Sequence, residues 1–220
     1  MTSEQSPNSP PPAEPGVRLF FCVQPDAEMR EAMADLSSRL QKAARFTPLR
    51  ATWMEPDAFH VTLHFLGEVP ESAAKALVKR LPLAVSKIPP FELDFRHVGY
   101  FPKVGPPTVV WLGVHKAPPQ LEALRQAVGG LARSVGADIG EKDFTPHVTY
   151  ARLKSAKGTN VFAKMLETYK FAKLDKCPIA EVTLMQSITG SGPAQYKTYA
   201  TAPLLGAGKD EPDAAEGTPD

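Results

Sequence analysis

Apolar and polar positions alternate with two periodicities along the chain, one typical of strands and one typical of helices. Residues 17–24 form a short apolar and aromatic run, which favours a strand. Pro25 and Asp26 then supply a stop and a helix cap. The apolar positions that follow recur at helical spacing: Met29, Met33, Leu36 and Leu40. The chain therefore opens with a strand followed by a helix.

Further strands and helices are expected as far as residue 201. The patterns predict strands over residues 59–66, 91–100, 108–114, 145–153, 179–188 and 196–201, and helices over 72–85, 119–135 and 160–169. A turn rich in Pro and Gly separates the strands at 91–100 and 108–114, which indicates an antiparallel pair. The element order is neither strictly alternating nor segregated, so we predict an α+β fold with antiparallel sheets.

Composition limits the folded part and its partners. Residues 1–16 and 206–220 are rich in Pro, Ser, Gly, Asp and Glu, so we expect two solvated tails around one folded region at 17–205. With 43% hydrophobic residues, the 220-residue chain can build a sizeable core. The 25 basic and 24 acidic residues leave a net charge of +1, which excludes the broad basic surface of a duplex-coating protein. Any contact with nucleic acid should be local.

Cysteine usage and hydropathy indicate the compartment. Cys22 and Cys177 belong to no metal-ligand or redox spacing, so we expect buried free thiols in a reducing environment. The N-terminus has no apolar segment of the signal-peptide kind, and no run approaches the length of a membrane helix. We expect a cytoplasmic monomer with no membrane partner.

One tetrapeptide type occurs twice and carries the chemistry. His60-Val61-Thr62-Leu63 returns as His147-Val148-Thr149-Tyr150, each time in an expected strand. By composition, a histidine is followed by apolar, hydroxyl and apolar residues in roughly 1–2% of cases, so two instances among five histidines are a real signal. The repeat predicts two similar halves that each contribute one copy to a shared cleft.

Strand geometry indicates what each copy can do. Residues i and i+2 share a face, so His60 and Thr62 should lie together, with Val61, Leu63 and Phe65 on the core side. His147 and Thr149 repeat this arrangement in front of Val148 and Tyr150. One face of each strand is then apolar, and the other carries imidazole and hydroxyl groups.

Two facing imidazoles suit phosphodiester hydrolysis. A neutral imidazole can take a proton from water while an imidazolium gives one to the leaving oxygen, because the ordinary pKa near 6.5 allows both forms. The hydroxyls of Thr62 and Thr149 can donate hydrogen bonds to the non-bridging oxygens. This chemistry requires no metal and no cofactor.

Several stretches in the same order resemble the 2H phosphoesterases. They are RLFF at 18–21, FHVTLHFLG at 59–67, GYFP at 99–102 leading to VWLGV at 110–114, and FTPHVTYAR at 144–152. Within that group the chain resembles the bacterial and archaeal RNA 2′,3′-cyclic phosphodiesterases, also called 2′-5′ RNA ligases. The resemblance covers about residues 17–204.

The resemblance implies a bilobal fold whose antiparallel sheets line a central groove, with RNA ends carrying a 2′,3′-cyclic phosphate as substrate. It implies a 2′-phosphomonoester product, His60 as proton donor and His147 as proton acceptor, with 2′-5′ ligation as a possible reverse activity. Arg152 matches an arginine of the family and suits phosphate oxygens. Its odd offset from His147 puts it on the opposite face, unless the strand ends or bulges or the side chain reaches round the edge.

Other residues allow further interpretations. His60 and His64 are spaced as a helical metal pair, but a strand is expected here, and His64 would instead share the catalytic face. His97 and His115 have no partner motif, so surface or hydrogen-bonded positions are expected. Four aromatics are candidates for stacking RNA bases, although core or loop packing is the commoner role of each: Tyr100, Phe101, Tyr150 and Tyr196.

Two competing functions stay open at this point. The protein could hold a terminal RNA phosphate without cleaving it, although fixed cations would serve a pure binder better than histidines. It could also be a 2H enzyme that acts on small cyclic or 2′-5′-linked nucleotides, which substrate length would distinguish from an RNA enzyme.

Overall fold

The structure, a computed structural model, describes residues 16–140, 143–154, 157–169, 171–188 and 195–206. These residues form one antiparallel sheet in the order β7-β4-β5-β6-β3-β1-β8-β9, with β2 also paired to β6. The strands are β1 (Gly16–Val23), β2 (Ala51–Trp53), β3 (Val61–Pro70), β4 (Phe91–Phe101), β5 (Val109–Val114), β6 (His147–Leu153), β7 (Lys173–Ile179), β8 (Glu181–Ile188) and β9 (Gln195–Pro203). The helices are α1 (Ala27–Ala44), α2 (Glu71–Val85), α3 (Pro119–Arg133) and α4 (Thr159–Leu166), with single 3-10 turns at Pro56–Ala58 and Glu167–Tyr169.

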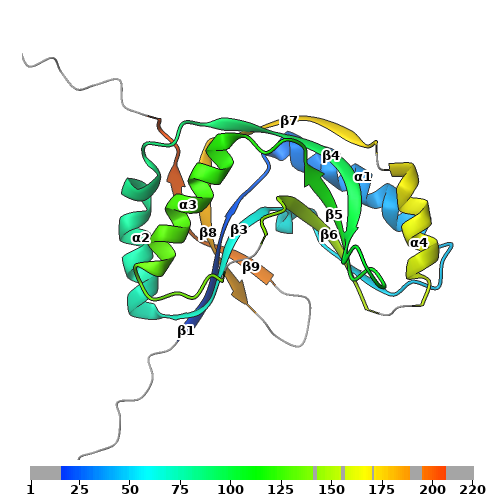
Figure 1. Ribbon diagram of the computed structural model, residues 1–220, viewed down its shortest axis with the longest axis horizontal. Coiled ribbons are helices and arrows are strands. Elements are labelled where there is room, and N and C mark those ends of the chain that lie inside the picture. Colours follow the sequence, from blue (N-terminus) through cyan, green and yellow to red (C-terminus); the bar gives the residue numbers. More distant parts are fainter. Residues whose placement is uncertain (1–15, 141–142, 155–156, 170, 189–194, 207–220) are drawn as a thin grey trace, which may run out of the picture.

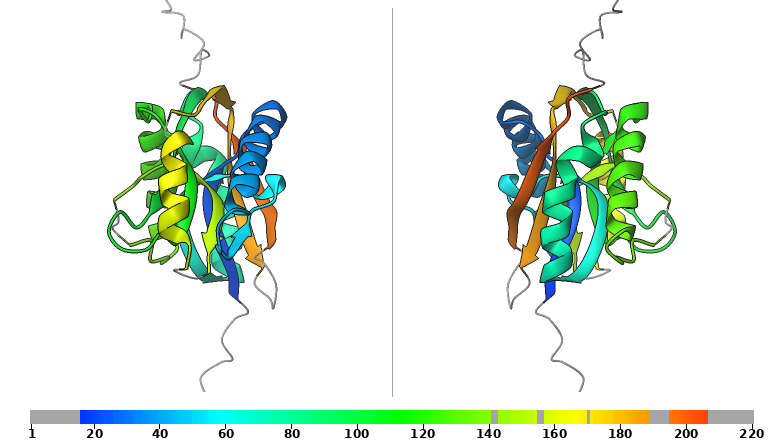
Figure 2. Two further views of the ribbon diagram at one scale, coloured as in Figure 1. Left: turned by 90° about the vertical axis from the view of Figure 1, so that its right-hand side faces the viewer. Right: turned by 90° about the vertical axis from the view of Figure 1, so that its left-hand side faces the viewer.

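The sheet has two similar halves that meet at β3 and β6. β3, β1, β8 and β9 make the first half, and β6, β5, β4 and β7 make the second. Helices α2 and α3 pack on the first half, whereas α1 and α4 pack on the second (Figure 1). The side views of Figure 2 bring α1 and α4 to the front in one panel and α2 and α3 in the other. The expected α+β fold of two similar antiparallel halves is confirmed.

The apolar stripes of the helices bury one face of the sheet. Asp26 caps α1 by accepting a hydrogen bond from the Met29 amide at 2.8 Å, as its position suggested. The main core contains the buried stripes of α1, α2 and α3. Phe20, Cys22 and Met185 form a separate small cluster away from it, with Tyr196 packed against them. We call the helix-covered side the core face and the other side the open face.

Three parts of the sheet differ from the sequence expectation, and the first is the short strand β2, which was not predicted. Strand β7 was not expected because Lys173, Asp175 and Lys176 leave little apolar alternation, and it lies at the sheet edge, where polar residues are tolerated. Strand β3 does not end at Gly67 but continues to Pro70. Gly67 adopts a φ of 69°, which fits a change of register against β1 at that point.

Some of the remaining expectations are tested by the described residues. Cys22 and Cys177 are both buried and free, as expected. No helix in these ranges is both long and apolar enough to cross a membrane. The expected tails fall almost entirely on residues 1–15 and 207–220, which lie outside the described residues, so they stay predictions.

Candidate active site

The two His-x-Thr motifs meet where the halves of the sheet join. Val61 of β3 lies opposite Val148 of β6 in an antiparallel pair, and both side chains are buried on the core face. The flanking side chains of His60, Thr62, His147 and Thr149 are half-buried on the open face. Continuing this register puts His60 level with Thr149, and Thr62 level with His147. The structure therefore brings the four expected residues together.

Each motif is followed by a β-bulge at the same position. Thr62 pairs with Cys22 and His64 with Phe21, so Leu63 has no residue opposite it in β1. In β6, Thr149 pairs with Trp111 and Ala151 with Val110, so Tyr150 is the extra residue. Two adjacent residues of each strand then face the core, namely Leu63 with His64 and Tyr150 with Ala151.

Because of the bulges, the side chains after Thr62 and Thr149 lie on the opposite faces from those that strict strand alternation predicts. His64 was expected on the catalytic face, and this is wrong: it is 7% exposed, and Nε2–H donates to the Arg125 carbonyl of α3 at 3.1 Å. Phe65 was expected on the core face, and this is also wrong: it is 57% exposed, and its ring centroid lies 5.5 Å from that of Phe20. Arg152 corresponds to Phe65 and returns to the open face with His147.

Both histidines are held by the same local contact. His60 Nδ1 donates to the Ala58 carbonyl at 2.8 Å, and His147 Nδ1 donates to the Thr145 carbonyl at 2.7 Å. A carbonyl oxygen only accepts, so these contacts place a hydrogen on Nδ1 in each ring. The Nε2 atoms are thereby left to exchange a proton with a bound molecule.

The surroundings favour neutral imidazoles in the free protein. Burial lowers the pKa of His60 to about 4, and the charges of His147 and Arg152 add to this, against the opposing effect of the Ala58 carbonyl. Burial also lowers the pKa of His147, with a further contribution from Arg152. Arg152 therefore acts on both histidines, as a residue on the same face would.

Aromatic rings enclose each imidazole. The centroids of Phe20 and Tyr196 lie 4.9 and 5.2 Å from that of His60. Phe101 and Trp111 lie 5.1 and 6.2 Å from His147. These apolar neighbours remove water from the rings, which is the burial that lowers their pKa values.

Comparisons with known proteins show which family the chain belongs to. Residues 39–190 match the model of the 2′-5′ RNA ligase superfamily. The chain belongs to this superfamily. A relative from Aeropyrum pernix, named RNA 2′,3′-cyclic phosphodiesterase, is 33% identical over 162 residues, which are 73% of this chain and 90% of the relative. A protein of the same name from Archaeoglobus fulgidus is 33% identical over 178 residues, which are 80% of this chain and 95% of the relative.

Solved structures show the same fold. E. coli LigT complexed with 3′-AMP is 26% identical, with a TM-score of 0.66, and the match covers 86% of this chain and 98% of LigT. TT0787 of Thermus thermophilus is 25% identical with the same TM-score and coverage. The resemblance read from the sequence motifs is thus confirmed for the family and for the fold.

The four aromatic residues that the sequence offered for base stacking lie in different places in the structure. Phe101 and Tyr196 lie beside the histidines, as described. Tyr150 is fully buried and packs against Phe59 at 5.3 Å, so it cannot stack a base. Tyr100 packs against the main core and borders a small cavity away from the histidines.

Phe20, Phe65 and Trp111 were not among the stacking candidates from the sequence, although all three line the open face. The strand alternation of residues 18–22 would place Phe20 and Cys22 together, but both faces of that strand are apolar and give no contrast. For Trp111, the nearby Gly99 and Gly113 were a usable signal, because a side chain on either would touch the indole.

The metal alternative finds no support in the side-chain geometry. His60 and His64 lie on opposite faces of the sheet because of the bulge at Leu63. Within the described ranges, no group of three or more His, Cys, Asp or Glu side chains is arranged to hold a metal ion.

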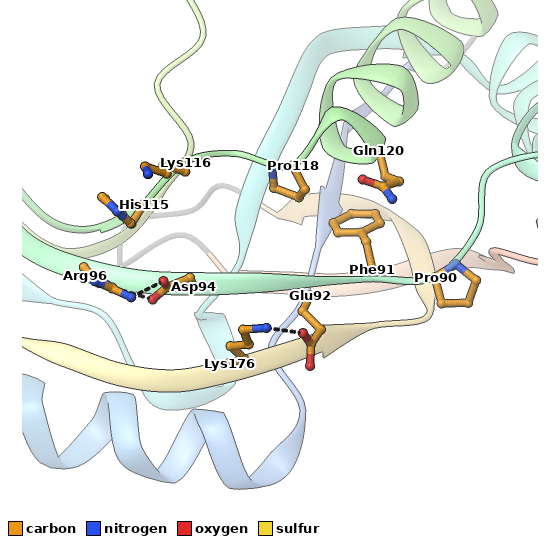
Figure 3. Close-up of a pocket in the computed structure, with 10 residues that line it drawn as sticks. All are labelled: Pro90, Phe91, Glu92, Asp94, Arg96, His115, Lys116, Pro118, Gln120 and Lys176. Carbon is orange, nitrogen blue, oxygen red and sulfur yellow. Dashed lines mark hydrogen bonds and ion pairs between the residues drawn. The ribbon is translucent and has the colours of Figure 1, made fainter.

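A cavity of about 710 Å³ lies apart from the motifs, between β4 and the segment that enters α3 (Figure 3). None of the five expected site residues lines it. Two of its cations are already paired, because Arg96 contacts Asp94 at 2.6 Å and Lys176 contacts Glu92 at 2.8 Å. The candidate active site is the cluster of residues around the two histidines and lies apart from this cavity.

Proposed function

We propose that this protein hydrolyses RNA 2′,3′-cyclic phosphate ends to 2′-phosphomonoesters by acid–base catalysis with His60 and His147. The observation that carries the proposal is the pair of His-x-Thr motifs on one face, each with Nδ1 engaged and Nε2 available. The relatives named RNA 2′,3′-cyclic phosphodiesterase support this choice of substrate. No metal takes part in the proposed reaction.

In the proposed reaction, His147 Nε2 accepts a proton from water while the water oxygen attacks phosphorus. The bond from phosphorus to the 3′ oxygen breaks, and His60 Nε2 gives a proton to that oxygen. The products are a 2′-phosphate and a 3′-hydroxyl, and each histidine is left in the protonation state from which the other started. Each correctly placed acid or base contributes roughly 10²–10⁴-fold to the rate.

The remaining residues bind and polarise the phosphate. The hydroxyls of Thr62 and Thr149 donate hydrogen bonds to its non-bridging oxygens, and the Arg152 guanidinium adds a charge-assisted contact. The negative phosphate raises the pKa of both imidazoles, which allows His60 to carry the proton that it donates. A 5′-hydroxyl attacking phosphorus in place of water, with loss of the same 3′ oxygen, would give a 2′-5′ link, which is the ligation expected as a possible second activity.

The direct test uses a short RNA that ends in a 2′,3′-cyclic phosphate, incubated with the wild-type protein in EDTA. The proposal predicts conversion to the 2′-phosphate isomer, identified by chromatography against both isomers. Turnover that stops in EDTA and returns with a divalent ion would overturn the mechanism. Tight binding without turnover would favour an RNA-end binding module, and turnover of cyclic mononucleotides alone would favour a small-nucleotide enzyme.

A further inference from the structure

Basic side chains continue the open face of the second half beyond the motif. Arg152 of β6 lies opposite Thr52 of β2, and the Lys154 amide donates to the Arg50 carbonyl at 2.8 Å. Residues opposite each other in an antiparallel pair share a face, as do residues i and i+2. Arg152, Lys154 and Arg50 therefore project from the same face as His147.

These three cations are available for a ligand. All three side chains are exposed, and none forms an ion pair with a carboxylate in the described part of the chain. Several other basic residues do form such pairs, including Arg96 with Asp94 and Lys176 with Glu92. Three cations without a carboxylate partner thus lie close together where β6 and β2 lead away from the histidines.

The corresponding open-face positions of the first half do not form a row of basic side chains. Phe65 occupies the place of Arg152, and the next open-face pair is Glu68 opposite Arg18. These positions carry an aromatic ring and two opposite charges, whereas the path through Arg152 carries three positive charges. A polyanion that reaches the histidines is attracted along the second half and not along the first.

The spacing suits a nucleic-acid strand. Arg152 and Lys154 are two positions apart, roughly 6.7 Å along the strand, a repeat comparable with that of successive phosphates in extended RNA. Lys154 lies roughly 20 Å from His147 along β6, counting the bulge. Single-stranded nucleic acid is commonly held by a basic groove that follows its backbone.

We infer that the strand preceding the cyclic phosphate runs along β6 towards β2, with its upstream phosphates bound by Lys154 and Arg50. This inference rests on the proposed function and specifies its substrate as an oligonucleotide rather than a cyclic mononucleotide. A basic surface limited to Arg152, Lys154 and Arg50 is compatible with the net charge of only +1 for the whole chain.

The test compares adenosine 2′,3′-cyclic phosphate with a tetranucleotide that ends in the same group. It uses the wild type, the double variant Arg50→Gln/Lys154→Gln, and the matched control Lys79→Gln/Arg80→Gln. The control removes the same two charge types from exposed positions of α2. Values of kcat/KM are measured at several salt concentrations, and circular dichroism checks that each variant is folded.

The inference predicts that the double variant lowers the ratio of kcat/KM for tetranucleotide over mononucleotide by about tenfold, as expected for two lost phosphate contacts. The slope of log kcat/KM for the tetranucleotide against log salt should become shallower by about 1.4, since one single-strand phosphate contact contributes about 0.7. A double variant that matches the control in both quantities would overturn the inference. Absence of wild-type turnover on both substrates would instead overturn the proposed function.

Discussion

Val61 lies directly opposite Val148 at the contact between β3 and β6. Because the pair is antiparallel, the histidine of each motif comes level with the threonine of the other. Each side of the proposed phosphate site is therefore built from both halves of the sheet. The proposed site therefore needs an intact sheet centre and both motifs.

The pH dependence should reflect the lowered pKa values of the histidines. A proton donor loses activity as pH rises through its pKa, and a base loses activity as pH falls through its own. The pKa of His60 is lowered to about 4, and that of His147 is also lowered. A profile of kcat/KM against pH should be bell-shaped, with its maximum below about pH 6.5. A plateau extending from neutral to alkaline pH would contradict this.

Replacing Arg152 by Gln should have two separable effects. Loss of a charge-assisted phosphate contact should lower kcat/KM by roughly 10–100-fold. Removing the positive charge should also raise the pKa of both histidines, because Arg152 lowers both. The maximum of the pH profile should therefore move to higher pH. Arg80→Gln on exposed α2 is the control, and an unshifted profile in Arg152→Gln would show that Arg152 does not act on the histidines.

His64 should matter for stability and not for catalysis. His64→Ala removes a buried ring that donates to the Arg125 carbonyl and packs against Gly129. Urea denaturation should show a loss of about 2 kcal/mol in the free energy of unfolding. The value of kcat/KM should stay within about threefold of wild type, since the His64 side chain is buried against α3 on the core face and does not reach the open face. A large loss of kcat without loss of stability would restore the substrate role suggested by the sequence.

Gly99 keeps Trp111 in place beside His147. A Cβ at Gly99 would lie 2.5 Å from the indole ring, so Gly99→Ala must displace Trp111 or the strand. We expect a loss of about 1–3 kcal/mol in the free energy of unfolding and a lower kcat/KM. Gly130→Ala is the matched control, because its Cβ would meet no atom within 4 Å and alanine favours the α3 helix. Equal stability of the two variants would contradict the packing described for Trp111.

The sequence was sufficient to place both His-x-Thr motifs and most of the elements around them. The repeat at His60 and His147 is visible without any alignment, and strand alternation correctly paired each histidine with its threonine. The helix stripes of α1, α2 and α3 were equally readable, because an amphipathic helix shows its buried face in its own sequence.

The bulges could not be read from either strand alone. A bulge is a mismatch between two strands, so it depends on β1 and β5 as much as on β3 and β6. The odd offset of Arg152 did point to a bulge in β6, which the structure contains. In β3 the bulge lies at Leu63, where the sequence of the strand carries no comparable signal, so strict alternation puts His64 and Phe65 on the wrong faces. The polar edge strand β7 was missed because its neighbours, not its composition, define it.

The acid–base pair is tested by measuring kcat/KM on an RNA ending in a 2′,3′-cyclic phosphate, in EDTA, for wild type, His60→Ala, His147→Ala and the double variant. If the two histidines act as one acid–base pair, each single variant should lose at least about 10²-fold. The double variant should then lose far less than the product of the two single losses. Wild-type activity in either folded single variant would contradict the account.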